Sequence, residues 1–353
     1  MSDIIFTINA ILPIVLIILV GYFITNIKVI NKVTGEKENF LSEKFLLKGN
    51  KLVFSLFLPT YLFFTLYNIK SLDQIHWDVT IFVLLGLIFL FGFGLFLGII
   101  LTKDGKKRGV ITQACFRSNY AIIGITLARA LGGAEGEQVM AIVVAFGGIM
   151  INVLGILSLT LFVGNDENGI KKTSKQLFFK IVKDILTNAL IIAILLGILV
   201  LGIRSFIPLN EGELVFSIKN DLPFIYEVMR MLSVVATPFA LVIAGGLFRF
   251  SAAKGVVKEL VAGSIVRLVI APVLLIFLAY MFNEWGIVNF NNAVYPCLIA
   301  MFATPVSVTA ALVASSMGSD TDLANQYVFW TSVASVVTLF LTILICKNIG
   351  LIG

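Results

Sequence analysis

The chain alternates between long uncharged hydrophobic runs and short charged loops, a pattern typical of a protein that crosses a membrane many times. A helix needs about 20 apolar residues to cross a hydrocarbon layer roughly 30 Å thick. Seven uninterrupted runs have about this length: Ile4–Ile27, Leu52–Ile69, Val79–Thr102, Gln138–Asn165, Ile185–Ile203, Met231–Phe248 and Leu323–Cys346.

Three further apolar stretches contain residues that interrupt the pattern. They are Gly109–Leu131 with Arg117 and Arg129, Leu260–Asn283 with Arg267, and Gly286–Met317 with Pro296 and Pro305. We therefore predict an all-α membrane protein with ten transmembrane helices. We expect the first run to be a permanent helix and not a signal peptide, because no Lys or Arg precedes it, its apolar run is long and no small-residue cleavage site follows it.

Composition agrees with lipid as the main solvent, since 59% of residues are hydrophobic and only 13% are charged. A water-exposed surface over 353 residues could not tolerate this bias. The three cysteines, Cys115, Cys297 and Cys346, fall inside predicted spans without metal-type spacing. We therefore expect the cysteines to be packing residues, and we expect no disulfide, metal site or cofactor.

The location of the basic residues explains the net charge of +6 without a polyanionic partner. With ten spans and an external N-terminus, 18 Lys and Arg residues fall in inner loops and five in outer segments. The positive-inside rule then places both termini outside the cell. We expect a multi-pass cell-membrane protein with the lipid bilayer as its environment and no nucleic-acid partner.

The two halves of the chain resemble each other. Phe116 and Gly132 of one half match Phe302 and Gly318 of the other at an offset of 186, and Glu135 matches Asp320 at an offset of 185. Pro59 and Pro238 stand at equivalent depths in the second and seventh spans. Five spans are an odd number, so two such repeats have opposite orientations, as in many secondary transporters. We predict a first repeat at 1–163, a cytoplasmic linker at 164–183 and a second, inverted repeat at 184–353.

Polar clusters in the fourth and ninth spans predict where a cargo binds. The fourth span carries Arg117, Ser118, Asn119 and Tyr120 about ten residues from its inner end, or roughly 15 Å into the bilayer. The ninth carries Thr304, Pro305, Ser307 and Thr309 at a matching depth. Pro305 favours a helix break that frees backbone groups for a ligand. The alternative is a simple kink, with the hydroxyls bonded to their own helix. Pro59 and Pro238 are further candidate breaks or hinges.

Arg117 is the most informative single residue. An arginine in mid-bilayer costs at least about 2.5 kcal/mol and must face a cavity or a partner. Every Asp and Glu lies in a loop or near a span end, so an anionic cargo is the simplest partner. The alternative is that Arg117 bonds backbone carbonyls freed by the break or reaches an inner vestibule. The same reasoning applies to Arg267 in the eighth span.

The absence of intramembrane acids argues against ion coupling by a carboxylate pair. Asn152 in the fifth span, with the fourth-span hydroxyls, could offer neutral oxygens to Na⁺, although Asn152 could equally join two helices. The lone histidine, His76, lies in an outer loop. Without clustered acids or histidines, the sequence does not predict an enzyme.

Four strings in the sequence resemble the auxin efflux carrier family over nearly the whole chain. They are "QACFRSNYAIIG", "LVFSLFLPTYLF", "TPFALVIAGGLF" and "ATPVSVTAALVAS". The family includes plant auxin exporters and bacterial permeases usually assigned to malate or related acids. The resemblance implies a scaffold and homodimer interface from spans one, two, six and seven. It implies a moving transport domain from spans three to five and eight to ten, with broken helices four and nine crossing.

By the same resemblance, cargo would bind at the crossing against Asn119 and Pro305 and move by an elevator-like shift. Two positions depart from the family pattern: Thr126 stands near a frequent proline, and Ser118 replaces a proline of the plant exporters. The joining loop lacks the long regulatory segment of many plant carriers, which favours a bacterial-type permease.

The leading hypothesis is a carrier of a small organic anion such as malate, with Arg117 and Asn119 on carboxylate oxygens. One alternative is a carrier, coupled to Na⁺ or H⁺, of another hydrophobic acid such as an auxin-like compound. A polytopic membrane enzyme or receptor is a more remote alternative.

Overall fold

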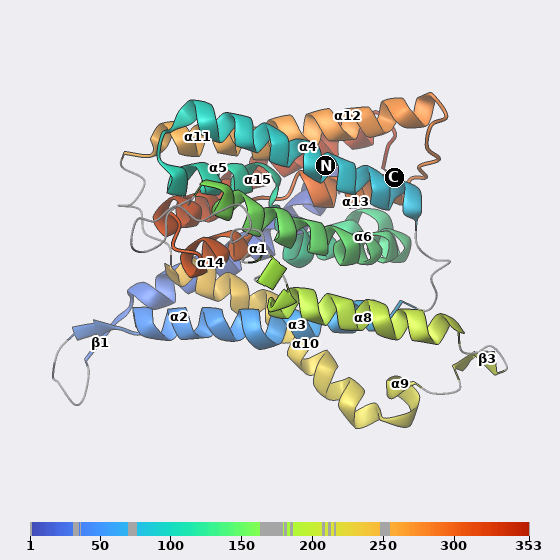
Figure 1. The fold of residues 1–353 in the computed structure, drawn as a ribbon, viewed down its shortest axis with the longest axis horizontal. Coiled ribbons are helices and arrows are strands. Elements are labelled where there is room, and N and C mark those ends of the chain that lie inside the picture. The colour runs from blue at the N-terminus through green and yellow to red at the C-terminus, as the bar shows by residue number, and fades with distance from the viewer. Residues whose placement is uncertain are drawn as a thin grey trace.

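The computed structural model describes residues 2–30, 35, 37–69, 76–162, 179, 182–183, 186–206, 209–210, 213–214, 217–247 and 255–352. Most of the predicted linker at 164–183 therefore lies outside the described residues. The described part is almost entirely helical (Figure 1). In lipid the backbone must satisfy its own hydrogen bonds, and uncharged runs of Leu, Ile, Val and Phe do so as helices.

The first half of the chain contains α1 (Ser2–Asn26), α2 (Glu43–Leu52), α3 (Leu58–Tyr67), α4 (Trp77–Leu101), α5 (Gly105–Phe116) and α6 (Ile125–Phe162). The second half contains α8 (Ala189–Phe206), α9 (Ile218–Asp221), α10 (Pro223–Leu247), α11 (Val257–Ile265), α12 (Ala271–Glu284), α13 (Val294–Phe302), α14 (Val308–Ser316) and α15 (Thr321–Asn348). The described residues also include two short antiparallel strand pairs: β1 (Lys28–Ile30) with β2 (Lys37–Asn39), and β3 (Leu209–Asn210) with β4 (Glu213–Leu214).

The described residues include three π-helical turns. They are η1 (Val53–Phe57) between α2 and α3, η3 (Tyr120–Gly124) before α6, and η5 (Val266–Ile270) between α11 and α12. Such wide turns occur often at functional positions. The long α6 consists of two helices that meet at Gly133, whose φ of 61° favours glycine.

Six of the described helical segments are long and apolar enough to cross a membrane. They are Trp77–Leu101, Ile142–Phe162, Ala189–Phe206, Pro223–Leu247, Val257–Glu284 and Thr321–Asn348. Large apolar side chains such as Leu85 and Phe96 on α4 and Val273 on α12 are exposed on the outside of the molecule. A surface of this kind is suited to lipid, so the chain is a multi-pass, all-α membrane protein.

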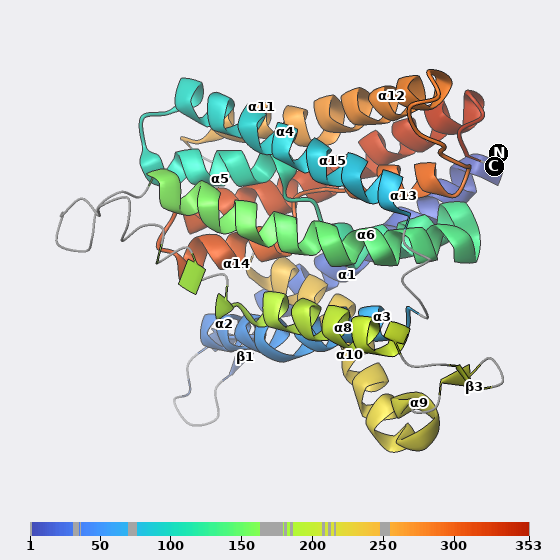
Figure 2. The same ribbon diagram turned by 45° about the vertical axis from the view of Figure 1, so that its right-hand side comes forward.

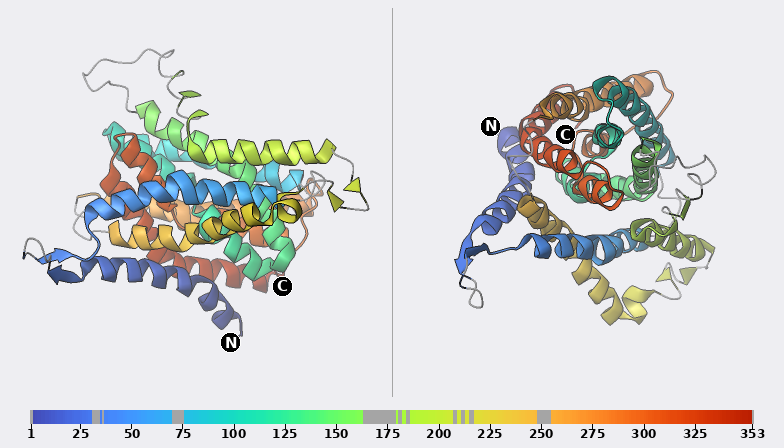
Figure 3. Two further views of the ribbon diagram at one scale, coloured as in Figure 1. Left: turned by 90° about the horizontal axis from the view of Figure 1, so that it is seen from below. Right: turned by 60° about the vertical axis from the view of Figure 1, so that its left-hand side comes forward.

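The helices form two groups that lie against each other. Figure 3 shows α4, α5, α6 and α11–α15 as a ring seen end-on, and α1, α2, α3, α8 and α10 as a row along one side of it. We call these the ring group and the row group. Figure 2 places both chain ends toward one end of the helices, opposite the β1–β2 hairpin.

Close helix contacts hold the row group together. An added Cβ at Gly21 of α1 would lie 2.1 Å from the carbonyl oxygen of Val242 on α10. An added Cβ at Gly245 of α10 would lie 1.9 Å from the carbonyl oxygen of Ile18 on α1. The α1–α10 pair therefore depends on glycine at both positions, as in other membrane helix pairs.

Candidate functional site

Two helices of the ring group are interrupted at its centre. The helix α5 ends at Phe116, and Arg117 and Asn119 have non-helical backbone angles before η3 begins. The helix α13 ends at Phe302, and α14 starts at Val308 with Ser307 as its N-cap. Pro305 lies in the second gap, where it removes a backbone donor. Both interruptions therefore lie at the polar clusters singled out in the sequence.

The two interrupted segments cross and bond to each other. Ser118 and Val306 form an isolated antiparallel β-bridge. On one side of it the Asn119 N–H donates to the Pro305 carbonyl at 2.8 Å, and on the other the Ser307 N–H donates to the Arg117 carbonyl at 2.9 Å. Backbone groups freed by the two breaks thus satisfy each other, which makes irregular backbone stable inside a membrane protein.

A small hollow lies beside this crossing. Its polar wall consists of Arg117, Asn119, Tyr120, Asn152, Ser307 and Thr309. Its apolar wall includes Leu58 and Leu62 of α3 and Leu190 of α8, so the hollow lies between the ring group and the row group. Its volume for a water-sized sphere is about 20 Å³, which accommodates about one water molecule.

Arg117 is 1% exposed, and its guanidinium reaches only uncharged partners among the bonds found in the described part of the chain. Nη2 donates to the Asn152 side-chain oxygen at 2.9 Å, and Nε donates to the Thr309 hydroxyl at 3.2 Å. Nη1 lies 3.5 Å from the Ile151 carbonyl oxygen, at the limit of a hydrogen bond. Neutral acceptors orient the guanidinium without cancelling its charge, so the hollow is positive.

Glycine makes room for this arginine. A Cβ added at Gly155 of α6 would lie 2.1 Å from Nη1 of Arg117. Gly155 follows Asn152 by three residues and therefore lies on the same helix face. The three-residue spacing of Asn152 and Gly155 is the sequence signal that one helix face serves the guanidinium.

Two further features of the hollow suit an anionic or hydrogen-bonding ligand. The Asn119 side-chain oxygen is buried without a hydrogen-bond partner in the structure, and because this oxygen is an acceptor, a ligand group that donates a hydrogen bond, such as a hydroxyl, can relieve its free-energy cost. The Ser307 hydroxyl accepts from the Thr309 N–H at 3.2 Å and thereby caps α14. The positive end of the α14 dipole consequently lies at the hollow.

The predicted site residues separate into two sets. The lining includes Arg117, Asn119, Tyr120, Asn152 and Ser307, and also Thr309. Four others lie outside it: Ser118 and Pro305 belong to the crossing segments, Thr304 donates to the Ala300 carbonyl at 2.8 Å, and Arg267 faces backbone carbonyls.

The other two predicted hinge prolines do not interrupt their helices. Pro59 occupies the first turn of α3, immediately after the π turn η1, and Pro238 lies inside the continuous α10. Neither resembles the gap at Pro305, and their role as hinges stays a prediction.

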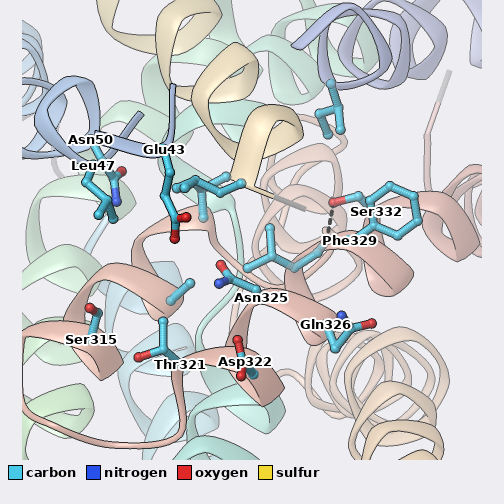
Figure 4. Close-up of a pocket in the computed structure, with 15 residues that line it drawn as sticks. Glu43, Leu47, Asn50, Ser315, Thr321, Asp322, Asn325, Gln326, Phe329 and Ser332 are labelled. Atoms are coloured by element: carbon cyan, nitrogen blue, oxygen red, sulfur yellow. Dashed lines mark hydrogen bonds between the residues drawn. The ribbon is translucent and has the colours of Figure 1, made fainter. Parts of the chain in front are cut away.

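Two larger cavities lie between the ring and row groups, near opposite ends of the helices. One, of about 150 Å³, is lined by Glu43 of α2 and by Asp322 and Asn325 of α15 (Figure 4). The other, of about 540 Å³, is lined by Asn68 beyond α3 and Glu137 of α6 among others. In the described ranges, no group of three or more His, Cys, Asp or Glu side chains could hold a metal ion.

Comparison with known proteins gives the family. A family model described as "Membrane transport protein", that of the auxin efflux carrier family, matches residues 6–343. No curated protein matches the chain. Because the match covers nearly the whole chain, this protein belongs to the auxin efflux carrier family of membrane transporters.

Proposed function

We propose that this protein is a secondary transporter of a small organic anion, such as malate or a related carboxylate, and that the hollow at the crossing is its binding site. The observation that carries the proposal is the buried Arg117 guanidinium, held by neutral partners beside an orphan Asn119 oxygen. A carboxylate would supply the missing negative charge and accept from the guanidinium. In this assignment Arg117 donates to a carboxylate of the cargo, and the Asn119 oxygen accepts from a hydroxyl such as that of malate. Tyr120, Asn152 and Ser307 complete the wall.

The volume of the hollow supports a mechanism in which the site opens. About 20 Å³ is too small for a dicarboxylate, so the ring and row groups must separate locally to admit one. The larger cavities near each end provide candidate routes from the two sides of the membrane. We propose that the ring group is the transport domain and slides along the row group in an elevator-like motion.

The same proposal includes ten spans in two inverted repeats, at 1–163 and 184–353. The mutual bonding of residues 117–119 with residues 305–307 is what two opposed copies of one interrupted helix would produce. Both chain ends lie toward the same end of the helices, in agreement with an even number of crossings (Figure 2). The charge asymmetry supports an outer location for that end, and the family resemblance supports a homodimer interface on the row group.

A second candidate is a carrier of a more hydrophobic acid, such as an auxin-like compound, coupled to Na⁺ or H⁺. The observation in its favour is the apolar wall that Leu58, Leu62 and Leu190 give to the hollow. A ring-bearing acid would place its carboxylate on Arg117 and its apolar part on these leucines. Inhibition of malate uptake by indole-3-acetate, and the Na⁺ or pH dependence of that uptake, would separate the two candidates.

Uptake of labelled carboxylates into proteoliposomes tests the proposal. We expect Arg117→Ala to lose most uptake and Asn119→Ala to lower the apparent affinity. Arg230→Ala is the matched control, because Arg230 is exposed and pairs with the exposed Glu227 on α10. Unchanged transport in both site variants would remove these residues from the site, and catalytic turnover of a carboxylate without transport would favour the remote alternative of a membrane enzyme.

A further inference from the structure

Arg267 is a second buried arginine at the crossing. Its partners are backbone carbonyls, whereas Arg117 donates to the side chains of Asn152 and Thr309. Arg267 belongs to the π turn η5, and its side chain is completely buried. Nη1 lies 3.4 Å from the Cys115 carbonyl oxygen and 3.3 Å from that of Phe116. Nη2 lies 3.1 Å from the Met301 carbonyl oxygen and donates to that of Phe302. One guanidinium therefore bonds the last two residues of both α5 and α13.

The physical need for a cation at this point follows from the helix ends. The last carbonyls of a helix lack intrahelical partners and carry about half a negative charge in sum. Two such ends meet here, so about one negative charge collects in the interior of the protein. The guanidinium supplies one positive charge and four terminal N–H bonds for the four carbonyl oxygens. The charge and the number of terminal N–H groups both match, while the fifth donor, Nε, is buried without a partner in the structure.

The arrangement also has the symmetry of the crossing. Cys115 and Met301 are separated by 186 residues, as are Phe116 and Phe302, and this is the offset that relates the two halves of the sequence. Each terminal nitrogen of Arg267 serves one of the two helices. Arg267 comes from a third segment of the chain, so it can hold both ends at once.

In carriers with interrupted helices, unwound carbonyls and half-helix C-termini coordinate the coupling Na⁺ or H⁺. We propose that Arg267 is a built-in cation that takes the place of a bound ion at the carbonyl ends of α5 and α13 and holds the crossing assembled. A tethered guanidinium cannot leave with the cargo, so this position does not couple transport to a sodium gradient. The proposal deepens the function proposed above, on which its reference to transport rests, while the role in assembly rests on the carbonyl contacts alone.

The test compares melting midpoints of the purified full-length protein in detergent, with choline chloride as the background salt. Arg267→Lys keeps the charge without the fork, and Arg267→Met removes the charge at similar length. We expect the midpoint to fall in the order wild type, Lys, Met. A Met variant as stable as the Lys variant would overturn the proposal, because hydrophobic replacement can equal a buried charge that has no electrostatic role.

A chemical rescue makes the test specific to this position. Arg267→Ala leaves space for a free guanidinium, and a ligand that binds only the folded state raises the melting midpoint. We expect millimolar ethylguanidinium to raise the Arg267→Ala midpoint saturably above that in equal choline, and to leave the wild type unchanged. The matched control is Arg204→Ala, since Arg204 donates to the Tyr67 carbonyl at 2.6 Å, away from the crossing. Rescue of neither variant, or equal rescue of both, would overturn the proposal.

Variants that do not yield folded protein still give an answer. The yield of monodisperse protein then replaces the midpoint, with the same order of variants and the same rescue expected when ethylguanidinium is present during purification. None of these measurements uses transport. Loss of the carboxylate-uptake result would therefore refute the proposed function and leave the role of Arg267 in assembly standing, and the reverse also holds.

Discussion

The Arg117 guanidinium donates to the Asn152 side-chain oxygen across 2.9 Å, and the Asn152 amide nitrogen donates in turn to the Gly148 carbonyl oxygen across 2.8 Å. Asn152 thus orients the arginine without neutralising it. Whether the side chain at position 152 is an amide or a carboxylate therefore decides whether the hollow is positive. Substitution of Asp for Asn makes this change without changing the shape of the side chain.

Asn152→Asp tests that relationship. A carboxylate would pair with Arg117 and cancel the charge that we assign to the cargo, so uptake of an organic anion should fall by about tenfold or more. The melting midpoint should stay close to that of the wild type, because the ion pair with Arg117 offsets the lost hydrogen bond to the Gly148 carbonyl. Asn152→Ala is the comparison: it leaves Arg117 charged and should retain more uptake than Asn152→Asp. Equal uptake by wild type and Asn152→Asp would show that the charge of the hollow is irrelevant.

Gly155→Ala should displace the guanidinium. The added Cβ would lie 2.1 Å from Nη1 of Arg117, which is far closer than side-chain atoms tolerate, so the arginine must leave its partners. We expect a several-fold loss of anion affinity in binding measurements. Gly147→Ala on the same helix is the control, since its Cβ would lie 3.4 Å from the nearest atom, an ordinary contact. Indistinguishable affinities for the two variants would contradict the assigned position of Arg117.

Ser307→Ala removes the cap of α14 together with a hydroxyl of the hollow. Loss of such a cap costs about 1 kcal/mol of stability, so the melting midpoint should fall measurably. Ser315→Ala in the last turn of the same helix is the control, because that side chain is exposed and such changes stay within about 0.5 kcal/mol. A melting midpoint of Ser307→Ala equal to that of the wild type would show that the cap contributes nothing to stability here.

Gly245→Ala should loosen the α1–α10 pair of the row group. The new Cβ would meet the Ile18 carbonyl oxygen at 1.9 Å, and overpacking of this kind typically costs about 1–3 kcal/mol. Gly202→Ala on α8 meets nothing within 4 Å and serves as the control. The thermal midpoints of the two variants give the comparison. The packing account is wrong if the Gly245 variant is as stable as the Gly202 variant.

Much of the crossing could be predicted from the sequence, because it depends on local signals. A proline and small hydroxyl residues in an apolar run indicate the break at residues 303–307. In the segment that crosses it, an arginine in mid-bilayer indicates the depth of the functional site. The two signals stand at related positions in the two halves. These local signals predict the folded structure well, because lipid offers no partner that could replace a missing backbone hydrogen bond.

The separate roles of the two arginines could not be predicted, because they depend on partners distant in the sequence. Arg117 and Arg267 look alike as single charges in apolar runs. The carbonyl partners of Arg267 come from residues about 150 positions earlier and about 35 positions later, and Arg117 meets Thr309 across 192 positions. The apolar wall from Leu58, Leu62 and Leu190 likewise arises only when the two helix groups pack.

The most direct test of the central claim is a comparison of wild type with Arg117→Gln in a thermal-shift screen of small carboxylates. Our account predicts that at least one carboxylate raises the wild-type melting midpoint saturably and leaves the Arg117→Gln midpoint unchanged. Equal stabilisation of both proteins, or no stabilisation of the wild type by any carboxylate, would contradict it.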